Sequence, residues 1–116
     1  MDEHPPNIRN AMNHLKFIRQ FPCLVCGDNT STEAAHIRYA DPKYLKPITG
    51  IGTKPPDCFT VPLCGKCHRE QHRGSEKKYW EVVGIDPIYV ALRLHAVSGD
   101  YDAGLAIINN LTSFLI

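Results

Sequence analysis

The sequence lacks any long hydrophobic run and any strong excess of charge. No uninterrupted apolar stretch in the 116 residues approaches the ~20 that a membrane-spanning helix needs, and Met1 is followed by polar residues rather than by a signal peptide. The net charge is only +1, and there is no internal repeat or low-complexity tract. These absences argue against membrane-spanning, fibrous and repeat proteins, so we expect a cytoplasmic protein without a membrane partner.

Length and composition indicate one globular domain. Hydrophobic residues make up 43% of the chain and charged residues 22%, which is ordinary for a globular domain. The charge is unevenly distributed, since residues 1–80 carry 12 Lys and Arg against 8 Asp and Glu, whereas residues 81–116 carry 1 against 4. An anionic partner is therefore expected to meet the first part of the chain.

Five cysteines are the strongest compositional signal, and four of them form two C-x-x-C pairs. Cys23 and Cys26 make the first pair, Cys64 and Cys67 the second, and Cys58 stands alone. Without a secretion signal, such pairs are more often metal ligands than disulfides, and redox dithiols normally occur singly. Four thiolates suit tetrahedral zinc, whose binding adds folding energy to a small core. The spacing therefore predicts a structural zinc site, with Cys58 as a small buried residue.

Turn and capping residues divide the remaining chain into short elements. A helix is expected from Ile8 to Gln20, where apolar residues recur at helical spacing. Strands are expected at residues 33–39 and 58–61, joined by a long loop at 41–57 that is rich in proline and glycine. Further helices are expected at residues 65–72, from the cap Ser75 to 83, from 86 to 97, and from 100 or 102 to near 115. This order predicts a single α+β domain, with a zinc-bearing core at 7–74 and a helical extension at 75–116.

Histidines add a second candidate site beside the cysteines. His68 and His72 directly follow the second cysteine pair, and this i, i+4 spacing places two imidazoles one helical turn apart, where they can share an ion. The alternative is that both are solvated residues on a basic helix. His36 is expected on the first strand. His95 falls on an apolar stripe, which favours a hydrogen-bonded histidine of the core.

Four stretches of the sequence carry a family resemblance. They are Phe21-Pro-Cys-Leu-Val-Cys-Gly27, Ala35-His36-Ile-Arg38, Lys54-Pro-Pro-Asp57 and Val61-Pro-Leu-Cys-Gly-Lys-Cys-His68. Together with His72 they resemble the HNH nucleases of the ββα-metal (His-Me finger) superfamily, and more closely the recombination-enhancing nucleases of phages and small nucleases of prophages. The resemblance implies a ββα-metal, treble-clef-like core flanked by an N-terminal helix and C-terminal helices. It also implies hydrolysis of DNA, with a recombinase or another phage or host recombination protein as a partner.

The resemblance further implies a role for each residue of the site. His36 would deprotonate the attacking water and Asp57 would orient His36, while His68 and His72 would hold a divalent ion such as Mg²⁺. An imidazole can act as a base near neutral pH, and a dication beside a phosphate supplies Lewis-acid stabilisation. DNA contacts are expected mainly at phosphates, from seven basic residues: Arg38, Lys43, Lys46, Lys54, Lys66, Arg69 and Arg73.

Two departures from the family pattern keep other functions open. Many family members carry a His or Asp ligand immediately before the base, where this chain has Ala35, and Asp57 stands nearest to the place of the usual Asn. The metal would then be held by two imidazoles with water and phosphate. One alternative is a catalytically silent zinc finger that binds nucleic acid, and another is a protein-interaction domain, favoured by the acidic and apolar end of the chain. The three motif histidines favour the enzyme, because a silent finger needs only its thiolates.

Overall fold

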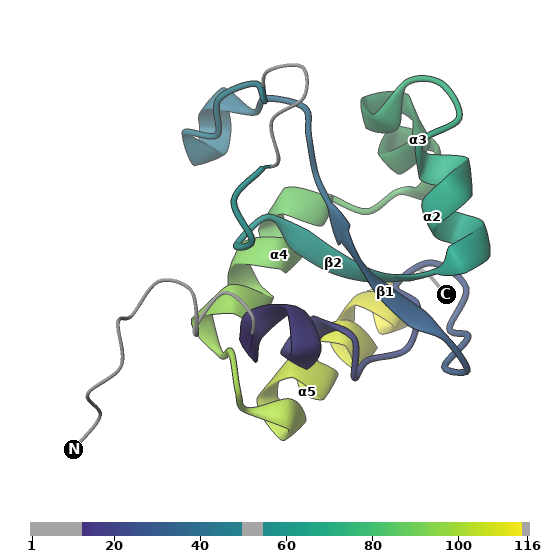
Figure 1. Cartoon of the computed structure of the whole chain (residues 1–116), viewed down its shortest axis with the longest axis vertical. Helices are drawn as coiled ribbons and strands as arrows, with labels where there is room; N and C mark the ends of the chain where they lie inside the picture. Colours follow the sequence, from purple (N-terminus) through teal and green to yellow (C-terminus); the bar gives the residue numbers. More distant parts are fainter. Residues whose placement is uncertain (1–12, 50–54, 115–116) are drawn as a thin grey trace.

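Two short strands form an antiparallel sheet that joins distant parts of the chain. The computed structural model describes residues 13–49 and 55–114. Strand β1 spans Thr32–His36 and strand β2 spans Thr60–Cys64, with His36 opposite Thr60 at one end (Figure 1). Both strands differ from the expected ranges, and β2 continues through Pro62. A proline is tolerated there because each strand of a two-stranded sheet is an edge strand, so its missing N–H can face away from the partner.

Helix α2 follows β2 without a loop. It spans Gly65–Gln71 and begins where the sulfur of Cys64 accepts a hydrogen bond from the backbone N–H of Cys67. It ends at Gln71 with His72 as its C-cap, which agrees closely with the expected helix at residues 65–72. Of the helix expected over residues 8–20, residues 13–18 are helical and the part before residue 13 lies outside the described residues.

The three expected C-terminal helices are confirmed with boundaries close to those predicted. Helix α3 spans Glu76–Val83, α4 spans Pro87–Ala96 and α5 spans Tyr101–Phe114. The side chains of Ser75 and Asp86 accept backbone N–H groups at the starts of α3 and α4. These caps satisfy donors that a helix start leaves without a partner. In the described ranges, no helix is both long enough and apolar enough to cross a bilayer.

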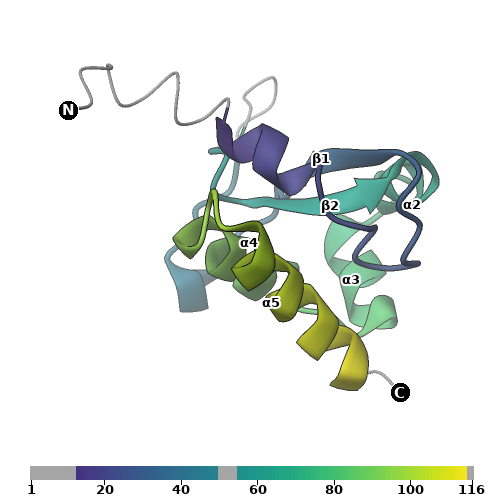
Figure 2. The same cartoon turned by 90° about the horizontal axis from the view of Figure 1, so that it is seen from below.

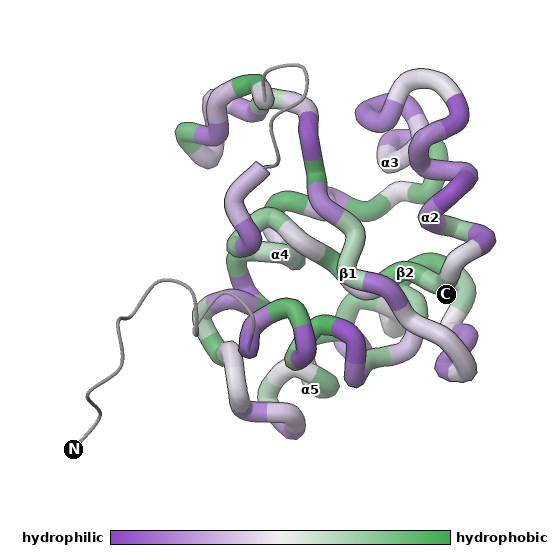
Figure 3. Tube along the Cα trace, in the orientation of Figure 1, coloured by the Kyte–Doolittle hydropathy of each residue, from purple (hydrophilic) through white to green (hydrophobic). Residues whose placement is uncertain are grey.

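The core lies between the sheet and the helices α4 and α5. All five residues of β2 are buried, and α4 and α5 pass along one side of the sheet, as Figure 2 shows. Hydrophobic residues concentrate along β2, α4 and α5, whereas α2 is mostly hydrophilic (Figure 3). Gly104 in α5 permits a close approach, because a Cβ at this position would lie 2.4 Å from Cζ of Phe21. The segment before the first cysteine pair is thus packed directly on the last helix.

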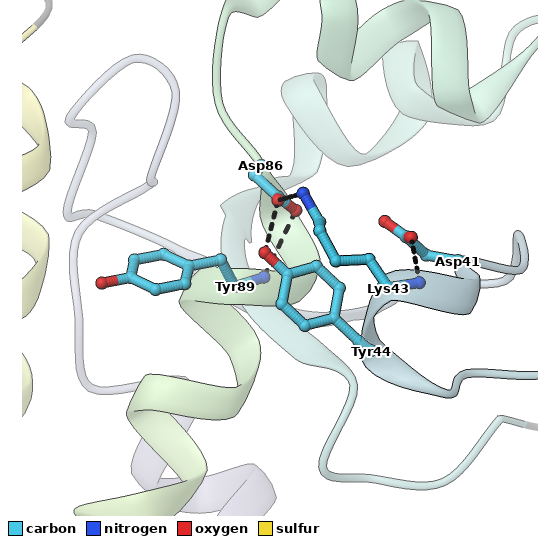
Figure 4. Close-up of polar contacts among 5 residues, drawn as sticks. All are labelled: Asp41, Lys43, Tyr44, Asp86 and Tyr89. Atoms are coloured by element: carbon cyan, nitrogen blue, oxygen red, sulfur yellow. Dashed lines mark hydrogen bonds and ion pairs between the residues drawn. The ribbon is translucent and has the colours of Figure 1, made fainter.

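The long connection between the strands is attached to the rest of the fold at the start of α4. It contains a short 3-10 helix, η1, at Pro42–Tyr44. The hydroxyl of Tyr44 donates to Asp86 at 2.7 Å, and the ammonium of Lys43 lies 3.4 Å from the same carboxylate (Figure 4). Asp86 therefore both caps α4 and holds the connection.

The position of Lys46 corrects the expectation that it contacts phosphate. Its side chain is only 3% exposed, and its ammonium lies 5.1 Å from the centre of the Phe59 ring. The residue is turned inward because its backbone pairs with Asp41 across η1, with N–H to carbonyl distances of 3.0 and 3.1 Å. A lysine held in this way supports the connection and is not available to an anionic ligand.

Candidate functional site

The four cysteines of the two C-x-x-C pairs converge on one point. The sulfurs of Cys23, Cys26, Cys64 and Cys67 all lie within 4.8 Å of one another, and those of Cys26 and Cys64 are 3.7 Å apart. A tetrahedral zinc ion with Zn–S bonds of about 2.3 Å separates its sulfurs by about 3.8 Å. The cluster thus has the composition and the dimensions of a four-thiolate zinc site, and it can hold a zinc ion.

Each cysteine pair is built as a similar tight turn. The N–H of Cys26 points to the sulfur of Cys23, and the N–H of Cys67 points to the sulfur of Cys64, both at 3.5 Å. Gly27 closes the first turn with a φ of 80°, in the left-handed region that glycine adopts at little cost. The N–H of Leu24 donates to the carbonyl of Pro62 at 2.8 Å, which holds the first turn against β2.

Burial makes the charged thiolates of this cluster unfavourable unless a cation is bound. Cys23, Cys64 and Cys67 are buried, whereas Cys26 is exposed. Desolvation, followed by the neighbouring sulfurs, raises the pKa of the Cys67 thiol far above its ordinary value. A divalent ion would offset this penalty, because zinc binds the deprotonated thiolate. Cys58 is outside the group and only partly buried.

His36 and Asp57 are brought together at the other end of the sheet. The ring nitrogen Nε2 of His36 lies 2.8 Å from Oδ1 of Asp57, and both side chains are mostly buried, at 19% and 17% exposure. His36 ends β1, while Asp57 precedes β2 and its carbonyl accepts a hydrogen bond from the Thr60 hydroxyl. The strand register that pairs His36 with Thr60 therefore also places the carboxylate beside the imidazole.

His68 on α2 and His72 at its C-cap lie next to each other, with ring centres 4.9 Å apart. Nδ1 of His68 is 2.7 Å from a carboxylate oxygen of Glu33. Desolvation, followed by the neighbouring charges of His68 and Arg38, lowers the pKa of His72. A lowered pKa keeps an imidazole neutral, which is the form that binds a metal ion.

The contact of Glu33 with His68 is one that the sequence did not indicate. Glu33 lies on β1 opposite Leu63, next to the start of α2. Its proximity to His68 depends on the register of two strands that are distant in the sequence. No local pattern of the sequence signals this contact.

In the described residues, the motif histidines have different hydrogen-bond partners. His36 bonds to Asp57, and no hydrogen bond joins it to His68 or His72. Within residues 13–49 and 55–114, the four-cysteine cluster is also the one group of three or more metal-ligating side chains. For a second ion, His68 and His72 therefore offer one ring nitrogen each, and Glu33 bonds to the other nitrogen of His68.

The basic residues expected to contact DNA differ in their surroundings. Lys66, Arg69 and Arg73 are exposed on or just after α2, and Lys43 is exposed but paired with Asp86. Arg38 is partly buried, and its backbone N–H donates to Glu76 at 3.1 Å. Lys54 lies outside the described residues.

His95 corrects another expectation. It is exposed at the end of α4 and not a histidine of the core, whereas His14 is only 3% exposed. The buried face of α4 is formed by residues that include Ile88, Ala91 and Leu94, and His95 is not part of this face. The sequence held no signal for His14, because the residues that cover it come from the far end of the chain.

Comparisons with known proteins place the chain in one family. The family described as Protein of unknown function (DUF968) matches residues 4–96, which include both cysteine pairs and the three motif histidines. No curated protein and no solved structure matches the chain. Since the match covers most of the sequence, the chain belongs to the DUF968 family.

Proposed function

We propose that this protein is a metal-dependent endonuclease of the HNH type that hydrolyses phosphodiester bonds of DNA. The observation that carries the proposal is the bond of 2.8 Å between His36 and Asp57, at the end of a sheet whose other end bears the thiolate cluster. A histidine oriented by a carboxylate is the usual arrangement of a general base. The thiolate cluster, when it holds zinc, would fix the hairpin on which that base stands.

The contact with Asp57 determines which nitrogen of His36 can take a proton. With Nε2–H donated to Oδ1 of Asp57, Nδ1 keeps its lone pair and can accept a proton from water. The resulting hydroxide attacks phosphorus, and the bond to the leaving oxygen breaks with its electron pair on that oxygen, which takes a proton from water. The imidazolium is stabilised by the Asp57 carboxylate. Asp57 thus acts as a positioning residue, in place of the Asn common in the resembled family.

The residues on and beside α2 suit a second, divalent ion. Nδ1 of His68 is held by Glu33, so Nε2 is free to face a metal, and a carboxylate on the far nitrogen is the usual support of a metal-bound histidine. A bound ion would supply Lewis-acid stabilisation of the phosphate. Ala35 is fully buried and offers no ligand. We therefore expect weak ion binding, completed by water and by the substrate.

The exposed basic residues of α2 fit a phosphate backbone as substrate. Lys66, Arg69 and Arg73 lie within eight residues of sequence, on α2 or just after it, as do the two histidines. Contacts of this kind bind the backbone without reading bases. A role in phage or prophage recombination, with a recombinase as partner, belongs to the same proposal.

A catalytically silent zinc module that binds nucleic acid or protein is the second candidate. It is favoured by the ligand count, since the described residues contain no group of three metal ligands around His68 and His72. Such a module would need neither the His36–Asp57 pair nor the contact of Glu33 with His68. The two candidates differ in one measurable property, which is cleavage that depends on a divalent ion.

The test is nicking of supercoiled plasmid by the zinc-loaded protein over a range of Mg²⁺ and Mn²⁺ concentrations. Loss of a general base typically lowers a rate by ~10²–10⁴-fold, so His36→Ala should lower nicking by at least the smaller factor while zinc content and DNA affinity stay unchanged. Arg93→Ala, which changes an exposed residue outside this site, is the control and should nick like the native protein. Equal rates for His36→Ala and native protein, or no metal-dependent nicking by the native protein, would overturn the proposal.

A further inference from the structure

A second pair of histidines lies on the side of the fold where the N-terminal helix meets the turn between α4 and α5. His14 belongs to the helical residues 13–18, and His95 to the last turn of α4. Their ring centres are 4.8 Å apart, and the rings are nearly perpendicular, at 83°. The two side chains line a hollow of about 380 Å³ together with three small or polar residues: Asn13, Ser98 and Gly99.

The two nitrogens of His14 have different surroundings. Nδ1 lies 2.8 Å from the hydroxyl oxygen of Ser98. Nε2 is buried, and among the described residues it has no hydrogen-bond partner. When Nδ1–H donates to Ser98, Nε2 carries an unused lone pair, and a buried polar atom without a partner is unfavourable by roughly 1–3 kcal/mol. In a native fold, we expect such an atom to have a bound ligand as its partner.

The electrostatic surroundings keep His14 neutral and ready to act as a donor to a cation. Burial, followed by the charge of His95, lowers the pKa of His14 to about 4, while the carboxylate of Asp57 acts in the opposite direction. The ring is therefore uncharged at neutral pH, and a negative charge lies within electrostatic reach. Neutral imidazoles are the ligands that Zn²⁺, Ni²⁺ and Cu²⁺ prefer among nitrogen donors.

We propose that His14 and His95 form a second transition-metal site, with Ser98 as the residue that orients His14. Two imidazoles that bind one ion through nitrogen at about 2.0–2.1 Å, with a tetrahedral angle between them, have ring centres about 5 Å apart. The observed separation of 4.8 Å already meets this requirement. His95 is exposed, so its ring can turn to admit the ion, and water in the hollow fills the remaining positions. The site is independent of the proposed nuclease activity.

The test is a calorimetric titration with Zn²⁺ of protein whose thiolate site already holds one equivalent of zinc. The background variant His4→Ala/His68→Ala/His72→Ala removes the other histidines that could compete, and leaves His14, His36 and His95. This background should bind one further ion. Adding His95→Ala should lower the affinity at least tenfold, and adding Ser98→Ala should lower it by ~10–100-fold, as expected for loss of an orienting partner. Arg93→Ala, an exposed change on the same helix, should leave it unchanged.

A second measurement places the ion, and it needs no variant of the buried residue. In long-range ¹H–¹⁵N spectra of the same background protein, Zn²⁺ should shift Nε2 of His14 and leave the His36 ring unchanged. No further ion in the titration, affinity that is the same with and without His95, or a shift confined to His36 would each overturn the proposal. Because no DNA is present, the result is separate from the outcome of the nuclease assay.

Discussion

At the scale of single residues, a histidine acquires its role from the group that holds one of its ring nitrogens. Asp57 holds Nε2 of His36, and Glu33 holds Nδ1 of His68. In each case the opposite nitrogen remains for a proton or a metal ion. The identity of the held nitrogen, more than the presence of a histidine, therefore determines which chemistry the position can support.

The buried ring of His14 predicts a loss of stability in mild acid. Its pKa is about 4 in the folded protein, below the ordinary 6.5. As the pH falls from about 6.5 toward 4, the unfolded chain binds a proton at His14 that the folded protein does not bind. The free energy of unfolding therefore decreases by up to about 3 kcal/mol. Below pH 4 both states are protonated and this effect ends.

Urea unfolding of the protein with one equivalent of zinc, measured between pH 7.5 and 5, checks this expectation. The control is His14→Asn, because asparagine can still bond to Ser98 but does not titrate. The difference in unfolding free energy between native protein and variant should shrink as the pH falls. A difference independent of pH would contradict the assignment of His14 as a buried, neutral ring.

The sequence predicted some of these residues better than others. Two C-x-x-C pairs close on themselves through local turns, so their spacing alone predicted the thiolate cluster. The contacts of Glu33 with His68 and of Ser98 with His14 join residues 35 and 84 positions apart. No local pattern encodes such contacts, because they depend on strand register and on the packing of helices.

At the scale of elements, helices were easier to predict than strands. Capping residues such as Ser75 and Asp86 mark helix starts locally, and the helices begin where those residues stand. The strands were expected at 33–39 and 58–61 and are found at Thr32–His36 and Thr60–Cys64. A strand ends where its partner ends, so its limits depend on a segment distant in the sequence.

At this scale, we predict how changes at the end of α2 and at its contact with β1 affect the dependence of nicking on a divalent ion. In the proposed nuclease, His72→Ala removes one of the two imidazoles for the divalent ion, so nicking should fall but recover in part at higher Mn²⁺ concentration. Glu33→Gln should behave in the same way and more mildly, because it loosens His68 without removing a ligand. Nicking rates as a function of Mn²⁺ concentration measure both effects.

The comparison with His36→Ala makes this prediction specific. An excess of metal cannot replace a missing base, so that variant should show no recovery at any Mn²⁺ concentration. Recovery of His36→Ala, or a rate for His72→Ala that does not respond to Mn²⁺, would contradict the separation of roles between β1 and α2.

At the scale of the whole molecule, the thiolate cluster joins segments that are distant in the sequence. It links the turn at Cys23–Gly27 to the junction of β2 and α2, and the sheet that it supports has only two strands. A two-stranded sheet is marginal by itself in water. The order of the first half of the chain should therefore depend on the bound ion, while α4 and α5 retain their own apolar contacts.

Removal of zinc is expected to unfold this part of the protein. Treatment with a strong chelator should lower the midpoint of thermal unfolding and reduce the helical circular dichroism, since structural zinc contributes folding energy directly. Cys64→Ser should do the same without chelator, whereas Cys58→Ser, outside the cluster, should have little effect. An unchanged melting midpoint in metal-free protein would show that the cluster is not what holds the fold.

The most direct test of the whole account is the position of bound ions in crystals grown with zinc and soaked with Mn²⁺. Anomalous scattering should place zinc among the sulfurs of Cys23, Cys26, Cys64 and Cys67, and a separate Mn²⁺ peak against the rings of His68 and His72. Together, the two peaks would establish a structural ion and a second ion placed to act on phosphate. Zinc alone, with no Mn²⁺ at the helix histidines, would contradict the proposed nuclease site and favour a zinc module without catalysis.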